Sequence, residues 1–140
     1  MEGLSEDPFD QMFPQNVQRQ ILNISKWARV ISVIGFGVGA FVVLTMIFNG
    51  AEMIQGAMAA MPIQMDGLYG ALVMVFFIFF FVAAGLLYFL YRASVLLRHG
   101  VEHKDTVLLG EGFGAIKRFF FILVIITIFG LSANFMALFQ

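Results

Sequence analysis

Three long stretches without a charged residue constrain this chain more than any other feature of its sequence. They cover residues 30–48, 69–91 and 119–139 and are 19, 23 and 21 residues long. Because a helix rises about 1.5 Å per residue, each stretch can cross a hydrocarbon core about 30 Å thick. The second stretch is apolar around its whole circumference, as expected of a helix surrounded by lipid and other helices. The sequence therefore predicts an all-α integral membrane protein with three transmembrane helices.

The composition agrees with this prediction. Hydrophobic residues make up 61% of the chain and charged residues 12%, which is too apolar for a soluble surface. A cleavable signal peptide is the alternative for the first stretch, but 29 residues precede it and the opening is acidic. The chain has no Cys, which excludes disulfides, thiolate metal sites and a Cys nucleophile.

The distribution of basic residues predicts an orientation. All eight Lys and Arg lie before the first stretch or between the second and third, at Arg19, Lys26, Arg29, Arg92, Arg98, Lys104, Lys117 and Arg118. Cytoplasmic loops accumulate positive charge because its translocation is disfavoured. We therefore expect a multi-pass protein of the bacterial inner (plasma) membrane with a cytoplasmic N-terminus and an external C-terminus.

The segments outside the three stretches have distinct characters. Residues 1–13 form an acidic cytoplasmic tail, and 14–29 predict an amphipathic interfacial helix with a stripe of Val17, Ile21, Ile24 and Ala28 and with Trp27 at headgroup depth. Residues 49–68 form an external Met-rich connection. Residues 92–118 predict a cytoplasmic basic helical hairpin that stops near Gly100 and restarts after an N-cap at Asp105 or Thr106. Within it, Arg92, Arg98, Lys104, Lys117 and Arg118, together with Trp27, are candidates for contact with headgroups or a partner.

Two patterns resemble metal sites. His99, Glu102 and His103 follow the H-x-x-E-H order of a zinc protease family, but no third ligand or substrate cleft accompanies them. A Met cluster on the outer side has thioethers that suit Cu(I), yet Met also fills interfacial helices: Met53, Met58, Met61 and Met65. We expect neither pattern to be a catalytic metal centre, and whether either binds metal stays open.

A third pattern has the outline of a dinucleotide-binding turn. Gly110, Gly112 and Ala115 fit G-x-G-x-x-A, but position 115 is four residues from the third stretch and leaves no room for a parallel sheet. We interpret these glycines as positions for helix packing or bending, and we expect no cofactor.

Small residues predict close helix packing. Ser32, Gly35 and Gly39 lie on one face of the first stretch, and Ala84 belongs to a second small surface in the second stretch. These faces either pack the protein's own helices or accept a partner. No ionisable residue lies within any of the three stretches, which disfavours a proton relay or an ion pathway.

Two segments carry a family resemblance. LNISKWARVISVIGFGVGAF opens the first span, and LYFLYRASVLLRHGVEHKDTVLLGEGFGAIKRFFFILVIITI joins the last two through a basic hairpin. On these segments the protein resembles a bacterial domain-of-unknown-function family of small helical inner-membrane proteins, and the resemblance covers about two thirds of the chain. The resemblance rests on hydropathy and charge patterns. It implies an inner-membrane location without an established activity, and no functional residues to carry over.

The sequence thus favours a non-catalytic accessory or structural subunit that packs against a larger membrane protein complex or against itself. We expect membrane lipids and a protein complex as partners, no nucleic acid and no enzymatic activity. The alternative is a homo-oligomeric pore or small-solute transporter whose pathway forms only on assembly.

Overall fold

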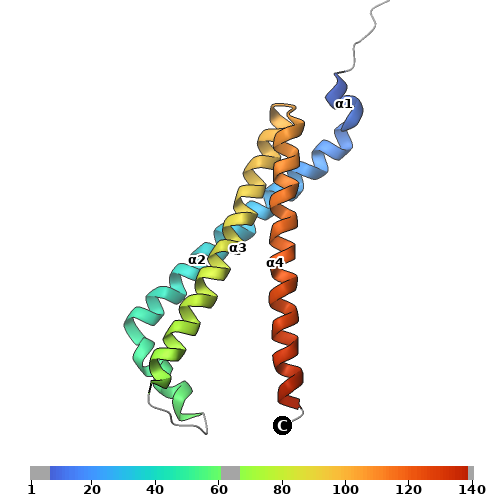
Figure 1. Cartoon of the computed structure of the whole chain (residues 1–140). Coiled ribbons are helices and arrows are strands. Elements are labelled where there is room, and N and C mark those ends of the chain that lie inside the picture. The colour runs from blue at the N-terminus through green and yellow to red at the C-terminus, as the bar shows by residue number, and fades with distance from the viewer. Residues whose placement is uncertain (1–6, 61–66, 139–140) are drawn as a thin grey trace, which may run out of the picture. The chain divides into compact units, whose positions relative to one another are not determined.

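The protein is helical throughout the residues that the structure describes. The computed structural model describes residues 7–60 and 67–138, except for the side chains of 133, 134 and 136–138. Its elements are α1 (Pro8–Met12), α2 (Gln15–Ala59), α3 (Leu68–Glu102) and α4 (Thr106–Leu138), and the described ranges contain no strand (Figure 1). Met61 and Met65 of the predicted Met cluster lie outside these ranges.

Three of the helices are long and apolar enough to span a membrane, as the sequence predicts. Within their most apolar windows, only 6%, 0% and 6% of the residues of α2, α3 and α4 are buried by the protein itself. At about 1.5 Å per residue, the 35 residues of α3 have a contour length of about 52 Å and the 45 residues of α2 one of about 68 Å, both longer than a hydrocarbon core is thick. Each of these two helices is therefore longer than one crossing of a hydrocarbon core requires.

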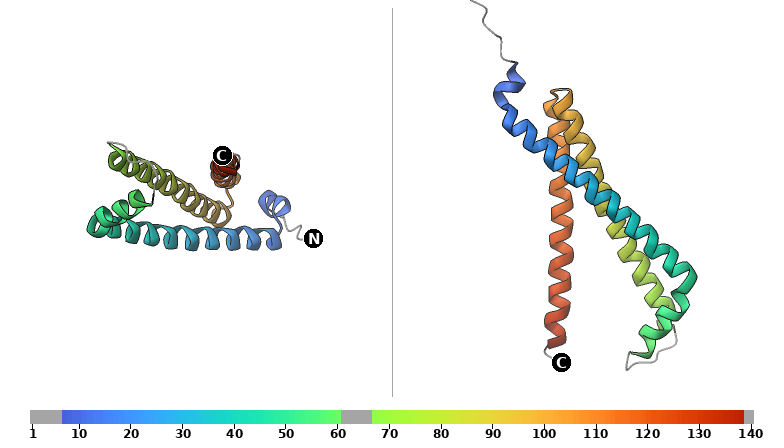
Figure 2. Two further views of the ribbon diagram at one scale, coloured as in Figure 1. Left: turned by 90° about the horizontal axis from the view of Figure 1, so that it is seen from below. Right: turned by 180° about the vertical axis from the view of Figure 1, so that it is seen from behind.

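The chain divides into two compact units. Unit 1 contains the residues up to Ser32 and those from Tyr88 onward, and unit 2 contains Val33–Leu87. In unit 1, the end of α3 and the start of α4 run antiparallel, and the start of α2 packs against them (Figures 1 and 2). The buried core of unit 1 consists of Phe9, Ile21, Leu97, Val101 and Leu109.

The start of α2 differs from the predicted interfacial helix in two respects. First, α2 runs from Gln15 to Ala59 as one helix, so residues 15–29 are not a helix separate from the first uncharged stretch. Second, its buried face is Ile21, Ser25, Ala28 and Ser32, whereas Ile24 is 47% exposed. Ser25 takes the place of Ile24 because a small hydroxyl side chain can hydrogen-bond to the neighbouring helix, as described below.

Two further segments are more helical than predicted. The acidic tail contains α1. Asp7 is the N-cap of this helix, because its side chain accepts a hydrogen bond from the Phe9 N–H at 3.3 Å, and Pro8 lies in the first turn. The predicted connection over 49–68 is helical in its first part, because α2 continues to Ala59.

Unit 2 is a helix pair formed by the rest of α2 and the start of α3. An added Cβ on Gly35 would come within 2.5 Å of Leu87 Cδ2, and one on Gly39 within 3.7 Å of Phe80. The two glycines therefore face α3 of the same chain. Phe76 and Phe80 stack with ring centroids 6.4 Å apart on α3.

Candidate functional site at the α3–α4 hairpin

The turn between α3 and α4 is a Schellman motif centred on a lysine. Lys104 has φ 51°, the left-handed region that normally favours Gly. The Asp105 N–H donates to the Gly100 carbonyl at 2.9 Å and the Lys104 N–H to the Val101 carbonyl at 3.3 Å, which are the two hydrogen bonds of this motif. α3 therefore ends at Glu102, two residues past Gly100, near which the sequence predicted a stop.

Asp105 also begins the next helix. Its Oδ1 accepts hydrogen bonds from the N–H groups of Val107 at 2.8 Å and Leu108 at 3.3 Å, so it is the N-cap of α4. Asp105 thus takes part in both the C-terminal motif of α3 and the N-cap of α4, so the connection between the two helices is short.

Two glycines bring α3 and α4 into close contact. An added Cβ on Gly100 would lie 2.8 Å from the Leu109 side chain and 2.9 Å from its backbone nitrogen. An added Cβ on Gly112 would lie 2.8 Å from the Leu97 side chain and 3.1 Å from its backbone nitrogen. Each helix therefore packs a buried leucine against a glycine of the other helix. In both helices the leucine precedes the glycine by three residues. Gly112 serves packing, as the sequence suggested for the G-x-G-x-x-A pattern.

The start of α2 is joined to α3 by a buried hydrogen bond. The Ser25 hydroxyl donates to the Ser94 carbonyl at 2.7 Å, and both side chains are at most 3% exposed. Ser32 is fully buried and donates within its own helix to the Ala28 carbonyl at 2.7 Å. Small polar residues satisfied in this way allow two helices to approach closely.

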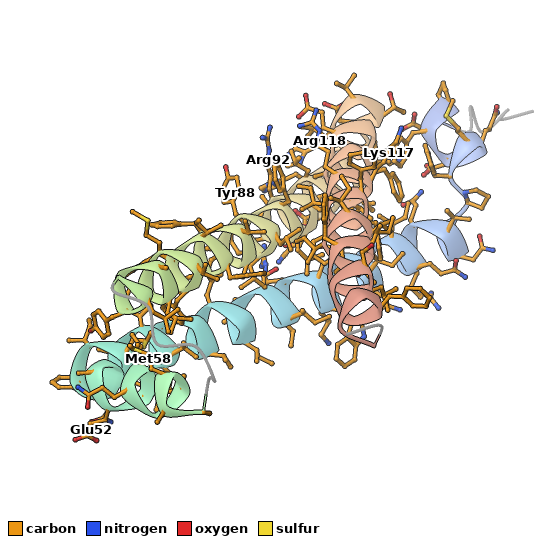
Figure 3. All side chains as sticks on the ribbon, turned by 60° about the horizontal axis from the view of Figure 1, so that its bottom comes forward. Glu52, Met58, Tyr88, Arg92, Lys117 and Arg118 are labelled. Atoms are coloured by element: carbon orange, nitrogen blue, oxygen red, sulfur yellow. The ribbon has the colours of Figure 1, made fainter. Side chains whose placement is uncertain are left out.

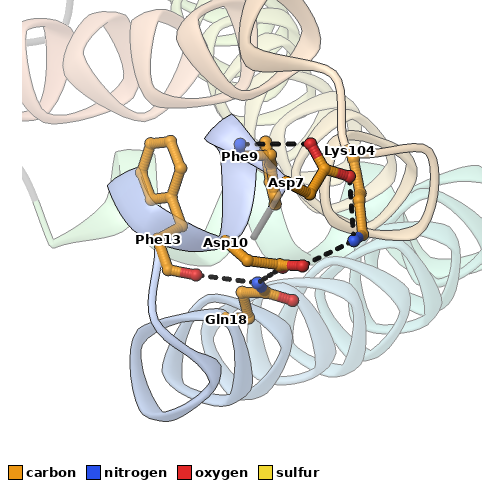
Figure 4. A network of polar contacts seen from close by, with 6 residues as sticks. All are labelled: Asp7, Phe9, Asp10, Phe13, Gln18 and Lys104. Atoms are coloured by element: carbon orange, nitrogen blue, oxygen red, sulfur yellow. Dashed lines mark hydrogen bonds and ion pairs between the residues drawn. The ribbon is translucent and has the colours of Figure 1, made fainter. Parts of the chain in front are cut away.

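Lys104 holds α1 against the hairpin turn. Its Nζ lies 3.1 Å from Asp7 Oδ2 and 2.7 Å from Asp10 Oδ2 (Figure 4). Gln18 Nε2 donates to Asp10 Oδ1 at 2.8 Å and to the Phe13 carbonyl at 2.7 Å. The hydrogen bonds from Lys104 and Gln18 lower the pKa of Asp10. The carboxylates of Asp10 and Asp7 in turn raise the pKa of Lys104. The sequence did not reveal this network, although Asp7-Pro8 is a helix-start signal.

The five basic hairpin residues fall into three groups. Lys104 is paired with α1, and Arg98 forms an ion pair with Glu102 at 2.7 Å, which lowers the pKa of Glu102. Among the described residues, Arg92, Lys117 and Arg118 have no ion pair. Arg92 and Arg118 line one groove of about 470 Å³ with Phe89, Val107, Gly110, Glu111, Gly114 and Ala115.

The groove faces one side of the hairpin. Figure 3 shows Arg92 of α3 and Arg118 of α4 on the side that also carries Tyr88. A second groove, of about 580 Å³, shares Phe89, Gly114 and Arg118 with the first and adds Lys117, Phe121 and Ile122. The two grooves are therefore continuous.

A separate cleft of about 420 Å³ lies between α2 and α3. It is lined by Leu22, Ser25, Lys26, Arg29, Arg98 and Glu102. Trp27 is 66% exposed and does not belong to this lining. The structure therefore does not bring Trp27 and the five hairpin cations into one site.

The two histidines do not gather metal ligands in the described part of the chain. His103 Nδ1 lies 3.0 Å from the His99 carbonyl, the ring centroids are 5.7 Å apart, and Glu102 is paired with Arg98. No three His, Asp or Glu side chains of the described residues lie together as a metal site. Met53 is 56% exposed and Met58 half-buried, both on the last turns of α2.

The predicted packing residues lie around a groove in unit 2, except for Ser32, which belongs to unit 1. This groove measures about 360 Å³ and is lined by the side chains and backbone of Gly35, Phe36, Val38, Gly39, Ala40, Val42, Phe76, Phe79, Phe80, Ala83, Ala84 and Leu87. Gly35, Gly39 and Ala84 are only half-buried. Packing between α2 and α3 therefore leaves part of this small-residue surface open.

Comparison with known proteins adds no relative. No protein-family model, curated protein or solved structure matches the chain.

Proposed function

We propose that this protein is a non-catalytic accessory subunit that packs against a larger membrane protein assembly. One observation carries the proposal: the open groove of unit 2, about 360 Å³, beside Gly35, Gly39 and Ala84. Between membrane helices, close approach over small residues yields van der Waals contact that flexible lipid tails match poorly. The groove is apolar and suits a helix of a partner protein.

The exposed surfaces of the three spans support the same proposal. At most 6% of the residues in their most apolar windows are fully buried within the chain, so most of them keep surface that faces lipid or partners. Within the uncharged stretches 30–48, 69–91 and 119–139, no Asp, Glu, Lys, Arg or His side chain offers chemistry or an ion pathway. The function then depends on what the spans pack against.

The proposal includes an orientation in the bacterial inner membrane. All eight Lys and Arg belong to unit 1, and unit 2 has none. Under the positive-inside rule, the α3–α4 hairpin and the N-terminus lie in the cytoplasm and the C-terminus lies outside. The exposed Trp27 would then lie near the inner headgroups.

The experiment is a gentle purification of a tagged chain from its native membrane, followed by mass spectrometry, with two variants. Gly39→Leu fills the groove, whereas Gly37→Leu adds the same side chain to a position that is open and outside the groove lining. We expect one defined partner to accompany the wild type and Gly37→Leu and to be lost from Gly39→Leu. Recovery of the wild type as a stable monomer would contradict the proposal.

The same purification tests the alternative function. A single homo-oligomer that carries a solute flux in liposomes would replace the accessory role by a pore or small-solute transporter.

A further inference from the structure

Two arginines of the α3–α4 hairpin are level with each other across one groove. The packing of Leu97 on Gly112 fixes the register of these antiparallel helices. Arg92 lies five residues before Leu97 on α3. In the antiparallel α4, the position at the same level is five residues after Gly112, which is Lys117, the neighbour of Arg118. The same groove is lined by Arg92 and Arg118, whose side chains lie on one side of the hairpin (Figure 3).

The arginines mark the boundary between charged and uncharged sequence. Arg92 directly follows the uncharged stretch 69–91, and Arg118 directly precedes 119–139. From this level the groove continues along Phe89, Phe121 and Ile122, which belong to the uncharged stretches. From the two arginines toward the uncharged stretches, the lining of the groove therefore changes from cationic to apolar in the direction of the helix axes.

The groove is open because its floor is made of glycine. An added Cβ on Gly110 or Gly114 would meet nothing within 4 Å, in contrast to Gly112, which is covered by Leu97. Because Gly110 and Gly114 have no side chain, the groove that Arg92 and Arg118 line has room for a ligand.

We propose that this groove binds one anionic phospholipid, with its phosphate between Arg92 and Arg118 and an acyl chain along Phe89, Phe121 and Ile122. Guanidinium groups bind phosphate oxygens by paired, charge-assisted hydrogen bonds. The apolar continuation favours a lipid over a free phosphate ion, which would use only the charged end.

The charge around the groove favours an anionic over a zwitterionic lipid. Arg92, Lys117 and Arg118 face a single carboxylate, that of Glu111. Glu111 is seven residues from Arg118, about 10 Å along α4, on the side away from the third uncharged stretch. It therefore lies beyond the phosphate position, and the phosphate level itself carries only positive charge.

The test is native mass spectrometry of the full chain in detergent, titrated with phosphatidylglycerol or with phosphatidylcholine of the same acyl chains. We expect one phosphatidylglycerol to bind about thirtyfold more tightly than phosphatidylcholine, the order expected for two basic residues at a headgroup. Arg92→Gln with Arg118→Gln should abolish this preference. Excess inorganic phosphate should not displace the lipid, and displacement would identify a phosphate ion site instead.

Two further variants distinguish a built site from general attraction. Gly114→Leu retains every charge but fills the groove, and it should weaken phosphatidylglycerol binding about as much as the arginine substitutions do. Arg19→Gln with Arg98→Gln removes the same number of charges outside the groove and should leave the preference unchanged. The proposal is overturned if this control pair reduces the preference as strongly, or if Gly114→Leu binds like the wild type. Circular dichroism of each variant verifies its helix content.

Discussion

Gly100 of α3 lies directly against Leu109 of α4. An added Cβ would be 2.8 Å from Leu109 Cγ and 2.9 Å from its backbone nitrogen, and the Leu109 side chain is 2% exposed. Leu97 and Gly112 repeat this relationship with the helices exchanged. The α3–α4 hairpin therefore depends on two positions at which no side chain can be accommodated without movement of the backbone.

Gly100→Ala is expected to destabilise the hairpin. Because the new methyl group meets backbone as well as side chain, the helices must separate, and overpacking of this kind costs about 1–3 kcal/mol. The measurement is the midpoint of unfolding in mixed micelles of increasing SDS fraction, followed by circular dichroism.

Gly110→Ala is the matched control for that substitution. It lies in α4 near Gly112, but its Cβ would point into open space. In a helix interior, Ala is more favourable than Gly by about 0.5–1 kcal/mol, so this variant should unfold later than the wild type. Equal midpoints for the two variants would show that the close contact at Gly100 is not a constraint.

Lys104 provides a second prediction, on backbone strain. Left-handed φ costs an L-residue about 1–2 kcal/mol, and Gly avoids this cost. Lys104→Gly and Lys104→Ala both remove the ion pairs to α1, so the difference between them isolates the backbone. We expect the Gly variant to be more stable than the Ala variant by about 1 kcal/mol in the same SDS titration. A difference near zero would mean that the turn has rearranged.

The sequence predicted those features that depend on local patterns and missed those that depend on tertiary contacts. The three spans follow from uncharged length, and the Asp105 cap from residue type and position. Gly100 suggested a helix stop because Gly often ends helices, but here it makes room for Leu109 while Lys104 adopts the left-handed turn. No local signal distinguishes these two uses of glycine.

The candidate site shows the same division. The basic residues of the hairpin were evident, but not that Lys104 binds α1 while Arg92 and Arg118 share a groove. Hydrophobic periodicity grouped Ile24 with the apolar stripe of residues 14–29. It could not show that Ser25 is buried, because the carbonyl to which Ser25 donates belongs to Ser94, 69 residues away.

That hydrogen bond gives a third prediction. Ser25→Ala should reduce stability by about 1 kcal/mol, because the bond between α2 and α3 is lost while the Ser94 carbonyl remains buried. The measurement is again the SDS unfolding midpoint. Ser132→Ala is the control: the Ser132 hydroxyl donates only within α4, to the Ile128 carbonyl, at an exposed position, and its removal should change little. Similar losses for both would argue against a specific role for Ser25.

The contact between α1 and the hairpin turn should depend on pH. The pKa of Asp10 is lowered from its ordinary value of 3.8, chiefly by the hydrogen bond from Lys104. A lowered pKa means that the contact is fully present above pH 3.8 and is lost as the pH falls through the lowered pKa. Spin labels on cysteines introduced at Gln11 and His103 can measure this, since the chain has no native Cys. The distance distribution should be narrow at pH 6 and broaden in acid.

Asp10→Asn is the control for this titration, because it retains the shape of the side chain and removes its charge. We expect a broad distribution at pH 6 and little further change on acidification. Lys104 sets the alkaline limit: its pKa is raised above 10.5, so its contribution is complete below that pH and declines only as the pH rises through the raised value. Both ion pairs are largely exposed, so high salt should broaden the distribution at pH 6 as well. A narrow distribution in Asp10→Asn at pH 6 would instead assign the docking of α1 to the buried Phe9.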